Sequence, residues 1–274
     1  MNELPNKSNY KYLEYLAKTG AKDIHPKKEA ATSFLIQRLA IKERQKILEV
    51  GFGTGETLLR IASHYDVVLY GIDSMPEMFR QAEKKLKSAG LDERINLSLI
   101  QKGSHFPYND NNFDIIYAES VLGFQDNPDL FHMIKEIFRV LKPSGRLGIN
   151  DSFWRKDLNN DTIRKINTGC LKDFGMRQAS DEYWTIDDWI KLYEKYGFRL
   201  KSSDLIENMN GSPSPSLPEG EKVRKNYFGK WEKVFTNPFL IKDRIGYRQK
   251  LRAHKQDGQY IEPWILILEK EDYA

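Results

Sequence analysis

The chain has 274 residues, of which 40% are hydrophobic and 12% aromatic, enough for one α/β domain with sizeable additions or for one domain and a small second one. Its 43 basic and 39 acidic residues give a net charge of +4, a mixed surface without the strong positive field of a nucleic-acid-binding protein. The single cysteine excludes an internal disulfide and an all-cysteine metal site, and no apolar run reaches the roughly 18 residues of a membrane span.

The first twenty residues do not resemble an export signal. They carry Lys7, Lys11, Glu14 and Lys18 among tyrosines, with neither a continuous apolar centre nor a small-residue cleavage site. Together with the lone cysteine, this predicts a soluble, cytoplasmic protein that holds no metal and contacts no membrane.

Two helices are expected between residues 10 and 40. Apolar residues spaced three and four apart define a first helix that ends at Lys18-Thr19-Gly20 and a second that begins near Pro26. The apolar face of the first helix is formed by Tyr12, Leu13 and Leu16.

A glycine-rich turn follows. Ile47, Leu48 and Val50 predict a buried strand, and three glycines at alternating positions, 51, 53 and 55, then open an amphipathic helix. Without a Cβ, the backbone can take positive φ and lie against a ligand, while the helix offers unpaired N–H groups. Taken alone, such a turn serves dinucleotides, phosphates or plain chain reversal.

The second and third strands are predicted at residues 67–73 and 95–100. The second ends in Asp73, where α/β nucleotide sites place an acid for a ribose diol; the alternative is a surface acid at a strand end. Ser74 is expected to cap the next helix, with Pro76 near its start. The third strand is followed by Gln101-Lys102-Gly103-Ser104, which contains no acid.

The fourth strand is predicted at Phe113–Tyr117, continuing into Ala118-Glu119-Ser120. Ligands of open α/β sheets bind beyond the carboxyl ends of such strands, so Glu119 is a candidate for contacting a ligand; as the alternative it caps a helix. A helix at residues 130–141 and a fifth strand at residues 146–150 follow, and the strand is succeeded by Asp151.

The remainder has a weaker pattern. Residues 151–184 are irregular apart from one helix near Ile163 and Ile166, and Thr185-x-x-Asp188 predicts the capped start of another helix. Strands are expected at residues 199–206 and 263–268. Between them, a flexible linker at residues 210–216 precedes helices near 221–235 and 239–255, the second of them strongly basic.

Several of these stretches together resemble the class I S-adenosylmethionine-dependent methyltransferases. Glu49-x-Gly51-x-Gly53-x-Gly55 is similar to motif I of that family, Phe113-Asp114-Ile115-Ile116-Tyr117 to its fourth strand, and residues 134–147 to its helix, turn and fifth strand. The resemblance covers roughly residues 45–205 and points to the small-molecule, ubiquinone/menaquinone-methyltransferase-like branch.

The resemblance implies a Rossmann-like α/β fold with a seven-stranded sheet in the order 3-2-1-4-5-7-6, the last strand antiparallel. It also implies an N-terminal helical cap (1–44), a core (45–206 and 261–270), a substrate lid (151–184) and a helical insertion (209–260). In such a cap, Tyr12 and His25 would face the methionine moiety; the plainer interpretation is a packed tyrosine and a turn histidine.

S-adenosylmethionine is therefore the expected cofactor. Its predicted binding residues are Glu49, Gly51, Phe52, Gly53, Thr54, Gly55, Asp73, Ser74, Met75, Gly103, Ser104 and Glu119. Many relatives place an acid after the third strand for the adenine amino group. Its absence here leaves recognition to backbone groups and the Ser104 hydroxyl, or to apolar contact.

The leading hypothesis for function is methyl transfer to O, N or C of a small-molecule acceptor by in-line displacement. A general base is needed only for a protonated acceptor, and the candidates are Glu119, Asp151 and His25. The chain lacks the Asn/Asp-Pro-Pro-aromatic motif of base and glutamine-amide methyltransferases, and one cysteine argues against thiolate-dependent ones. Two alternatives stay open: an RNA or protein methyltransferase that uses the basic insertion, and a non-catalytic cofactor-binding protein that dimerises through it.

Overall fold

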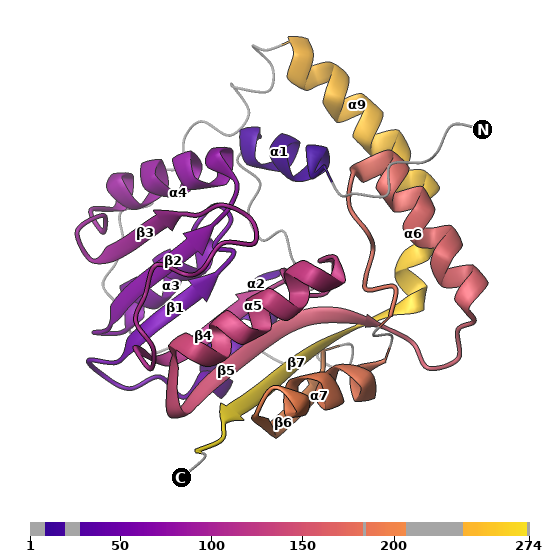
Figure 1. Cartoon of the computed structure of the whole chain (residues 1–274). Helices are drawn as coiled ribbons and strands as arrows, with labels where there is room; N and C mark the ends of the chain where they lie inside the picture. Colours follow the sequence, from indigo (N-terminus) through magenta and orange to yellow (C-terminus); the bar gives the residue numbers. More distant parts are fainter. Residues whose placement is uncertain (1–8, 20–27, 183–184, 207–237, 273–274) are drawn as a thin grey trace.

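A computed structural model describes residues 9–19, 28–182, 185–206 and 238–272. Its centre is a seven-stranded sheet in the order β3-β2-β1-β4-β5-β7-β6 (Figure 1), as predicted. The strands are β1 Lys46–Val50, β2 Val68–Asp73, β3 Ile95–Leu99, β4 Phe113–Glu119, β5 Leu141–Trp154, β6 Phe198–Leu205 and β7 Ile261–Lys270. Strands β1 to β5 pair in parallel, and β7 is antiparallel to both β5 and β6.

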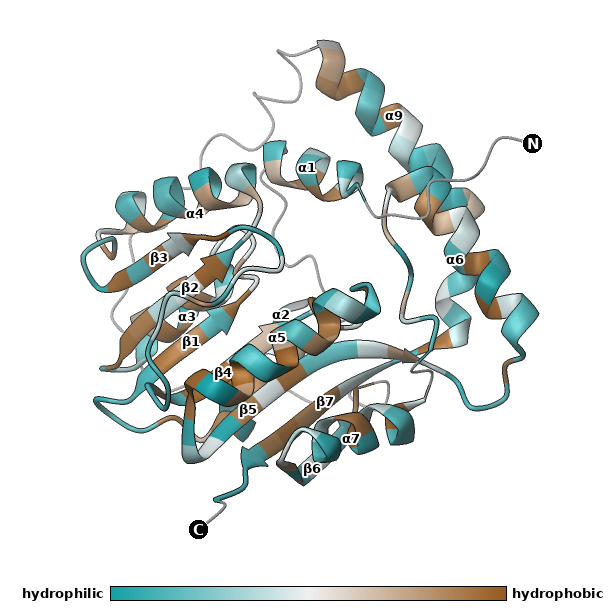
Figure 2. Cartoon of the chain, in the orientation of Figure 1, coloured by the Kyte–Doolittle hydropathy of each residue, from teal (hydrophilic) through white to brown (hydrophobic). Residues whose placement is uncertain are grey.

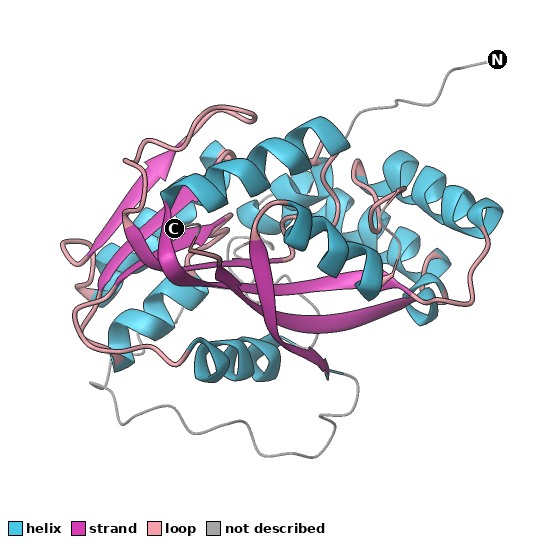
Figure 3. Cartoon of the chain, turned by 60° about the horizontal axis from the view of Figure 1, so that its bottom comes forward, coloured by secondary structure: helices cyan, strands magenta, loops and turns pink. Residues whose placement is uncertain are grey.

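Helices cover both faces of this sheet (Figure 3). They are α1 Lys11–Lys18, α2 Lys28–Leu39, α3 Glu56–His64, α4 Pro76–Ala89, α5 Asn127–Val140, α6 Asn160–Phe174, α7 Ile186–Lys195 and α9 Pro238–Ala253, with a short 3-10 helix, η2, at Asp257–Tyr260. None of the helices within the described ranges is long and apolar enough to cross a membrane.

The apolar strands explain the two core layers, because successive side chains of a strand point to opposite faces. In β1, Leu48 packs with α5 and α7 on one face, whereas Ile47 packs with α2, α3 and α4 on the other. Ile115 and Ile116 of β4 alternate in the same way. The central strands are accordingly brown in Figure 2, while the outer helices mix brown with teal.

Helix α2 was expected to form part of the N-terminal cap, but it packs against the sheet. Its residues Leu35, Ile36 and Leu39 are fully buried in the layer formed with α3 and α4, and the Arg146 guanidinium of β5 donates to the carbonyl of Leu39. Helix α2 therefore belongs to the core. Only α1, of the two helices expected within residues 1–44, lies at the ligand side.

Two boundaries also differ from expectation. Strand β5 is longer than the predicted 146–150, because antiparallel pairing with β7 continues from Arg146 to Trp154. The N-cap position of helix α4 is occupied by Met75 and not by Ser74, and Pro76 lies in the first turn. The capping box of Thr185 and Asp188, by contrast, is present as predicted.

Helices α6 and α9 form a side lobe at the end of the long β5–β7 ribbon, and α1 lies between this lobe and α4 (Figure 1). The small core of the side lobe contains Trp154, Ile163, Ile166, Cys170 and Phe174, with Tyr12 and Tyr247 packed against it. The predicted helix at 239–255 is α9, and the one at 221–235 lies outside the described residues.

Candidate active site

A cavity of about 1220 Å³, measured out to its open mouth, lies at the carboxyl ends of β1, β2 and β4. The glycine turn forms its floor, and residues from α1, α5 and the loop after β3 complete its walls. Eleven of the twelve residues predicted to bind the cofactor line it: Glu49, Gly51, Phe52, Gly53, Thr54, Asp73, Ser74, Met75, Gly103, Ser104 and Glu119.

The glycines of the turn have the positive φ expected of them. The values are 73° at Gly51, 51° at Gly53 and 73° at Gly55. A Cβ on Gly51 would stand 2.4 Å from Val121, whereas one on Gly53 would meet no protein atom within 4 Å. Gly53 therefore leaves open space for a ligand. Gly55 does not line the cavity; it is the N-cap of α3, packed against Ala82.

Asp73 connects the end of β2 to this turn. Its Oδ2 accepts a hydrogen bond from the Gly53 N–H at 2.9 Å, and its Oδ1 accepts one from the Met75 N–H at 2.8 Å. Burial raises the pKa of Asp73 to about 6, although these backbone donors and that of Ser74 act in the opposite direction. A carboxylate so placed can accept hydrogen bonds from a ribose diol.

Glu49 is a buried acid beside the turn. Burial, followed by the nearby charge of Glu119, raises its pKa well above the usual range. The Tyr117 hydroxyl donates to Glu49 Oε2 at 2.9 Å. This acid therefore lines the cavity in an environment that favours its neutral form.

Glu119 accepts hydrogen bonds from side chains of three different elements. Its Oε2 accepts hydrogen bonds from Thr32 of α2 and Asn150 of β5, and its Oε1 accepts one from Thr57 of α3, each at 2.8 Å. It lines the cavity, and it is the N-cap of none of the described helices. Its carboxylate fixes the end of β4 relative to α2 and α3.

Asp151, a candidate base, is not among the residues that line the cavity. Its oxygens accept hydrogen bonds from the backbone N–H groups of Gly123, Ser152, Val121 and Leu122. Burial raises its pKa to about 6 against these donors. Through these hydrogen bonds, Asp151 holds the loop after β4 in place. His25 lies outside the described residues.

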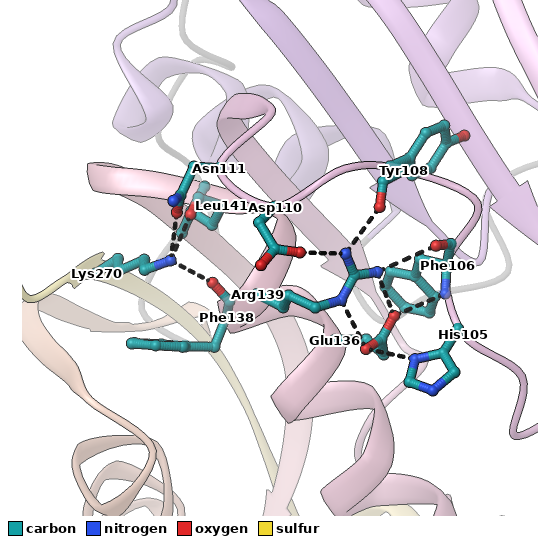
Figure 4. Close-up of polar contacts among 10 residues, drawn as sticks. All are labelled: His105, Phe106, Tyr108, Asp110, Asn111, Glu136, Phe138, Arg139, Leu141 and Lys270. Atoms are coloured by element: carbon teal, nitrogen blue, oxygen red, sulfur yellow. Dashed lines mark hydrogen bonds and ion pairs between the residues drawn. The ribbon is translucent and has the colours of Figure 1, made fainter.

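The loop between β3 and β4 is held by a pair on α5 (Figure 4). Glu136 Oε2 accepts hydrogen bonds from the Phe106 N–H at 2.8 Å and from Arg139 at 2.7 Å. Arg139 also donates to the carbonyls of Phe106 and Tyr108 and to Asp110. Burial acts to raise the pKa of Glu136, but the Arg139 and Phe106 hydrogen bonds outweigh it and lower the pKa to about 2.

The far end of the same loop is anchored by Lys270 of β7. Its ammonium donates to the Asn111 side chain and to the carbonyls of Phe138 and Leu141 at 2.7–2.8 Å (Figure 4). The loop that presents Gly103, Ser104 and Phe106 to the cavity is thus tied to α5 and to β7.

Sequence reasoning missed the residues that close the cavity. Tyr10 and Leu13 line it, and the Lys102 ammonium donates to the Tyr10 hydroxyl at 2.7 Å while pairing with Asp129 at 2.9 Å. Tyr12, the expected residue, instead packs its ring at a tilt against Phe174 and Tyr247. No sequence signal marks Tyr10, because its partners are distant in the chain.

Trp154, in the segment 151–184 that was predicted to form the lid, does not line the cavity. Trp154 is 1% exposed, and its indole N–H donates to the Ser180 carbonyl at 2.7 Å, so it packs in the side lobe. Tyr183 and Trp184 lie outside the described residues. Phe124, after β4, does line the cavity.

The cavity fits S-adenosylmethionine by its own chemistry. Asp73 offers two oxygens at the ribose position, Gly53 leaves room at the turn, and apolar walls for an adenine ring are supplied by Ile72, Met75, Met78 and Ile100. The family described as "Methyltransferase domain" matches residues 47–145, which contain the turn, Asp73 and β4.

The chain is an S-adenosylmethionine-dependent methyltransferase. Its cofactor is S-adenosylmethionine. This methyltransferase is 28% identical over 204 residues to 27-O-demethylrifamycin SV methyltransferase of Amycolatopsis mediterranei, a match covering 65% of this chain and 74% of that one. It is 32% identical over 115 residues to demethylmenaquinone methyltransferase of Lactobacillus johnsonii, covering 41% and 46%.

The fold of the methyltransferase is shared with solved structures. An S-adenosylmethionine-dependent methyltransferase from Geobacter sulfurreducens, in complex with S-adenosyl-L-homocysteine, superposes with a TM-score of 0.63 at 15% identity. The superposition covers 94% of this chain and 98% of that one. The shared fold therefore extends beyond the sheet to most of the chain.

Proposed function

We propose that the methyltransferase acts on a small-molecule acceptor, at O, N or C. The observation that carries the proposal is the closure of the cavity by α1. Tyr10 and Leu13 of this segment line the cavity, and Lys102 links Tyr10 to the loop after β3. An acceptor must therefore be small enough to enter a pocket between the glycine turn and α1.

Bound S-adenosylmethionine supplies a methyl group already activated by its sulfonium. Asp73 and Gly53 fix the nucleoside end, so that the protein's main task is to align the acceptor lone pair with the methyl–sulfur bond and to exclude water. Ser120, Val121 and Phe124 line the cavity at the end of β4 and border the acceptor. Asp151 holds these residues in place through the backbone N–H groups of their loop.

We also propose that Glu119, the candidate base that lines the cavity, does not take up the acceptor's proton. Among the three candidates, Glu119 alone lines the described cavity, and its two oxygens accept three hydrogen bonds from Thr32, Thr57 and Asn150. The protein's own donors therefore occupy three of the positions at which these oxygens could take up a proton. An acceptor with an available lone pair needs no base at this site.

The named acceptors of the relatives support a small molecule, since rifamycin and menaquinone derivatives both belong to that class. The match to the menaquinone enzyme spans only 41% of this chain, so a quinone is tested as one acceptor among several. The basic helix α9 contributes no residue to the lining of the described cavity, which favours a small acceptor over RNA or protein. A homodimer through the insertion remains a proposal.

The test is a methyl-transfer assay on the full chain, with release of S-adenosylhomocysteine as the readout. The acceptor panel contains hydroxylated aromatics, quinols, amines and apolar alkenes, with transfer RNA and a basic protein as comparison substrates. Turnover that requires a small molecule supports the proposal. Turnover with only RNA or only protein overturns it.

A further inference from the structure

Four side chains capable of binding a metal meet at the junction of α6, α9 and η2, away from the cavity. Cys170 lies on α6, His254 directly follows α9, and Asp257 begins η2. One donor atom of each lies within 4.8 Å of the others. Asp173, also on α6, contacts the opposite side of the His254 ring.

The two nitrogens of His254 face different groups. Nε2 lies 3.0 Å from Asp173 Oδ2, whereas Nδ1 lies 2.6 Å from Asp257 Oδ2 and 3.9 Å from Cys170 Sγ. A metal-binding histidine usually donates its second ring N–H to a carboxylate, which fixes the tautomer and orients the ring. Asp173 is placed to do this. The 2.6 Å contact between Nδ1 and Asp257 requires a proton on Nδ1, so a metal ion bound by Nδ1 would take the place of that proton.

The surroundings keep the ring and the sulfur together. Cys170 is 2% exposed, in the apolar core of the side lobe. Gly169 lets α6 approach the imidazole, because a Cβ at this position would stand 2.9 Å from His254 Cε1.

We propose that Cys170 Sγ, His254 Nδ1 and Asp257 bind one Zn²⁺ ion that fastens the end of α9 to α6, with Asp173 orienting the imidazole. Sulfur, imidazole and carboxylate together select a borderline-soft ion over Mg²⁺ or Ca²⁺. The Gln178 amide oxygen, 3.6 Å from the sulfur, or a water molecule supplies the fourth ligand. On binding, the S–H and Nδ1–H bonds break, the S–Zn and N–Zn bonds form, and both protons pass to solvent.

The ion would act at a distance from the methyl transfer. Tyr247 of α9 packs against Tyr12 and Tyr15 of α1, with ring centroids 4.9 Å from each. Tyr10, next to α1, lines the cavity. Fixing the end of α9 therefore supports the helix that closes the cofactor cavity, while cofactor binding itself does not need the metal ligands.

The test is titration of the full, chelator-treated chain with Co²⁺, a spectroscopic substitute for Zn²⁺. We expect one equivalent to produce thiolate-to-cobalt charge-transfer absorption, which excess Zn²⁺ then removes, and we expect Zn²⁺ to raise the melting temperature. Cys170→Ser should abolish the absorption, and Asp257→Asn should weaken Co²⁺ affinity at least tenfold. Asp243→Asn, an exposed acid on α9, is the matched control and should titrate like the wild type.

Absence of the charge-transfer band in the wild type would overturn the proposal, as would a band that survives in Cys170→Ser. Either result would leave the cluster as an ion-pair network around His254. If Cys170→Ser does not fold, Asp257→Asn decides, because it changes a residue of a short surface helix. Binding of S-adenosylhomocysteine is measured in parallel, so that a failed cofactor site is distinguished from a failed metal site.

Discussion

Asp73 accepts a hydrogen bond from the backbone N–H of Gly53 across 2.9 Å. This contact joins the acid at the end of β2 to the glycine turn after β1. The acceptor for the ribose hydroxyls is therefore positioned before the cofactor arrives, which lowers the ordering cost of binding.

The titration of Asp73 makes cofactor affinity depend on pH. Its pKa, raised by burial to about 6, means that the carboxylate loses its charge as the pH falls through that value, and with it the charge-assisted bonds to the ribose. We expect affinity for S-adenosylhomocysteine, measured by calorimetry, to decline below a pH of about 6. Asp73→Asn should bind more weakly at neutral pH and show little of this decline. An unchanged pH profile in the variant would contradict the assignment.

Gly53 and Gly90 provide a matched pair. Both have positive φ, 51° and 70°, and a Cβ added at either would meet no protein atom within 4 Å, but only Gly53 lines the cavity. Alanine at either site should cost roughly 1–2 kcal/mol of unfolding free energy from backbone strain. Only Gly53→Ala should also weaken cofactor binding, by more than tenfold. Equal affinities in the two variants would show that the turn does not contact the cofactor.

Variants of Tyr10 and Tyr12 distinguish the Lys102–Tyr10 hydrogen bond, which closes the cavity, from the packing of the side lobe. Tyr10→Phe removes the hydroxyl that accepts from Lys102 while keeping the ring, so we expect a loss of about 1 kcal/mol, or roughly fivefold, in cofactor or acceptor affinity. Tyr12→Phe should leave both affinities unchanged, since Tyr12 packs with Phe174 and Tyr247. A larger loss of affinity in Tyr12→Phe than in Tyr10→Phe would instead support the expectation from the sequence that Tyr12 faces the ligand.

Glu136 should contribute stability that is lost in acid. Its folded-state pKa of about 2 lies below its usual value of 4.5, so the contribution is complete above about 4.5 and disappears as the pH falls through about 2. Glu136→Gln should unfold more easily at neutral pH by about 1–3 kcal/mol, because Arg139 and the Phe106 N–H lose a charged acceptor. Denaturant unfolding across this range should show the two proteins converging as the pH is lowered.

The features that the sequence predicted well are those with strong local causes. The parallel strands are buried on both faces and so form apolar runs, and the turn needs glycine because Gly51, Gly53 and Gly55 all have positive φ. Asp73 follows from its place at the end of the second strand. Strand order came from the family resemblance and not from the residues themselves.

Features that depend on distant contacts were not predictable. Lys102 and Tyr10 are 92 residues apart, and no periodicity relates them. The sequence identified Glu119 as a ligand-facing acid, but its hydrogen bonds to Thr32, Thr57 and Asn150 arise only after α2 has packed on the core. Asp151 likewise has the chemistry of a base, and only the fold shows that backbone N–H groups occupy its oxygens.

The most direct test of the central claim is calorimetric binding of S-adenosylmethionine and S-adenosylhomocysteine to the wild type, to Asp73→Ala and to the control Gly90→Ala. We predict micromolar binding, about −8 kcal/mol, to the wild type and to Gly90→Ala. Loss of the Asp73 carboxylate should reduce affinity by about tenfold or more, because the charge-assisted hydrogen bonds to the ribose are lost. No binding by the wild type, or undiminished binding by Asp73→Ala, would contradict the proposed cofactor site.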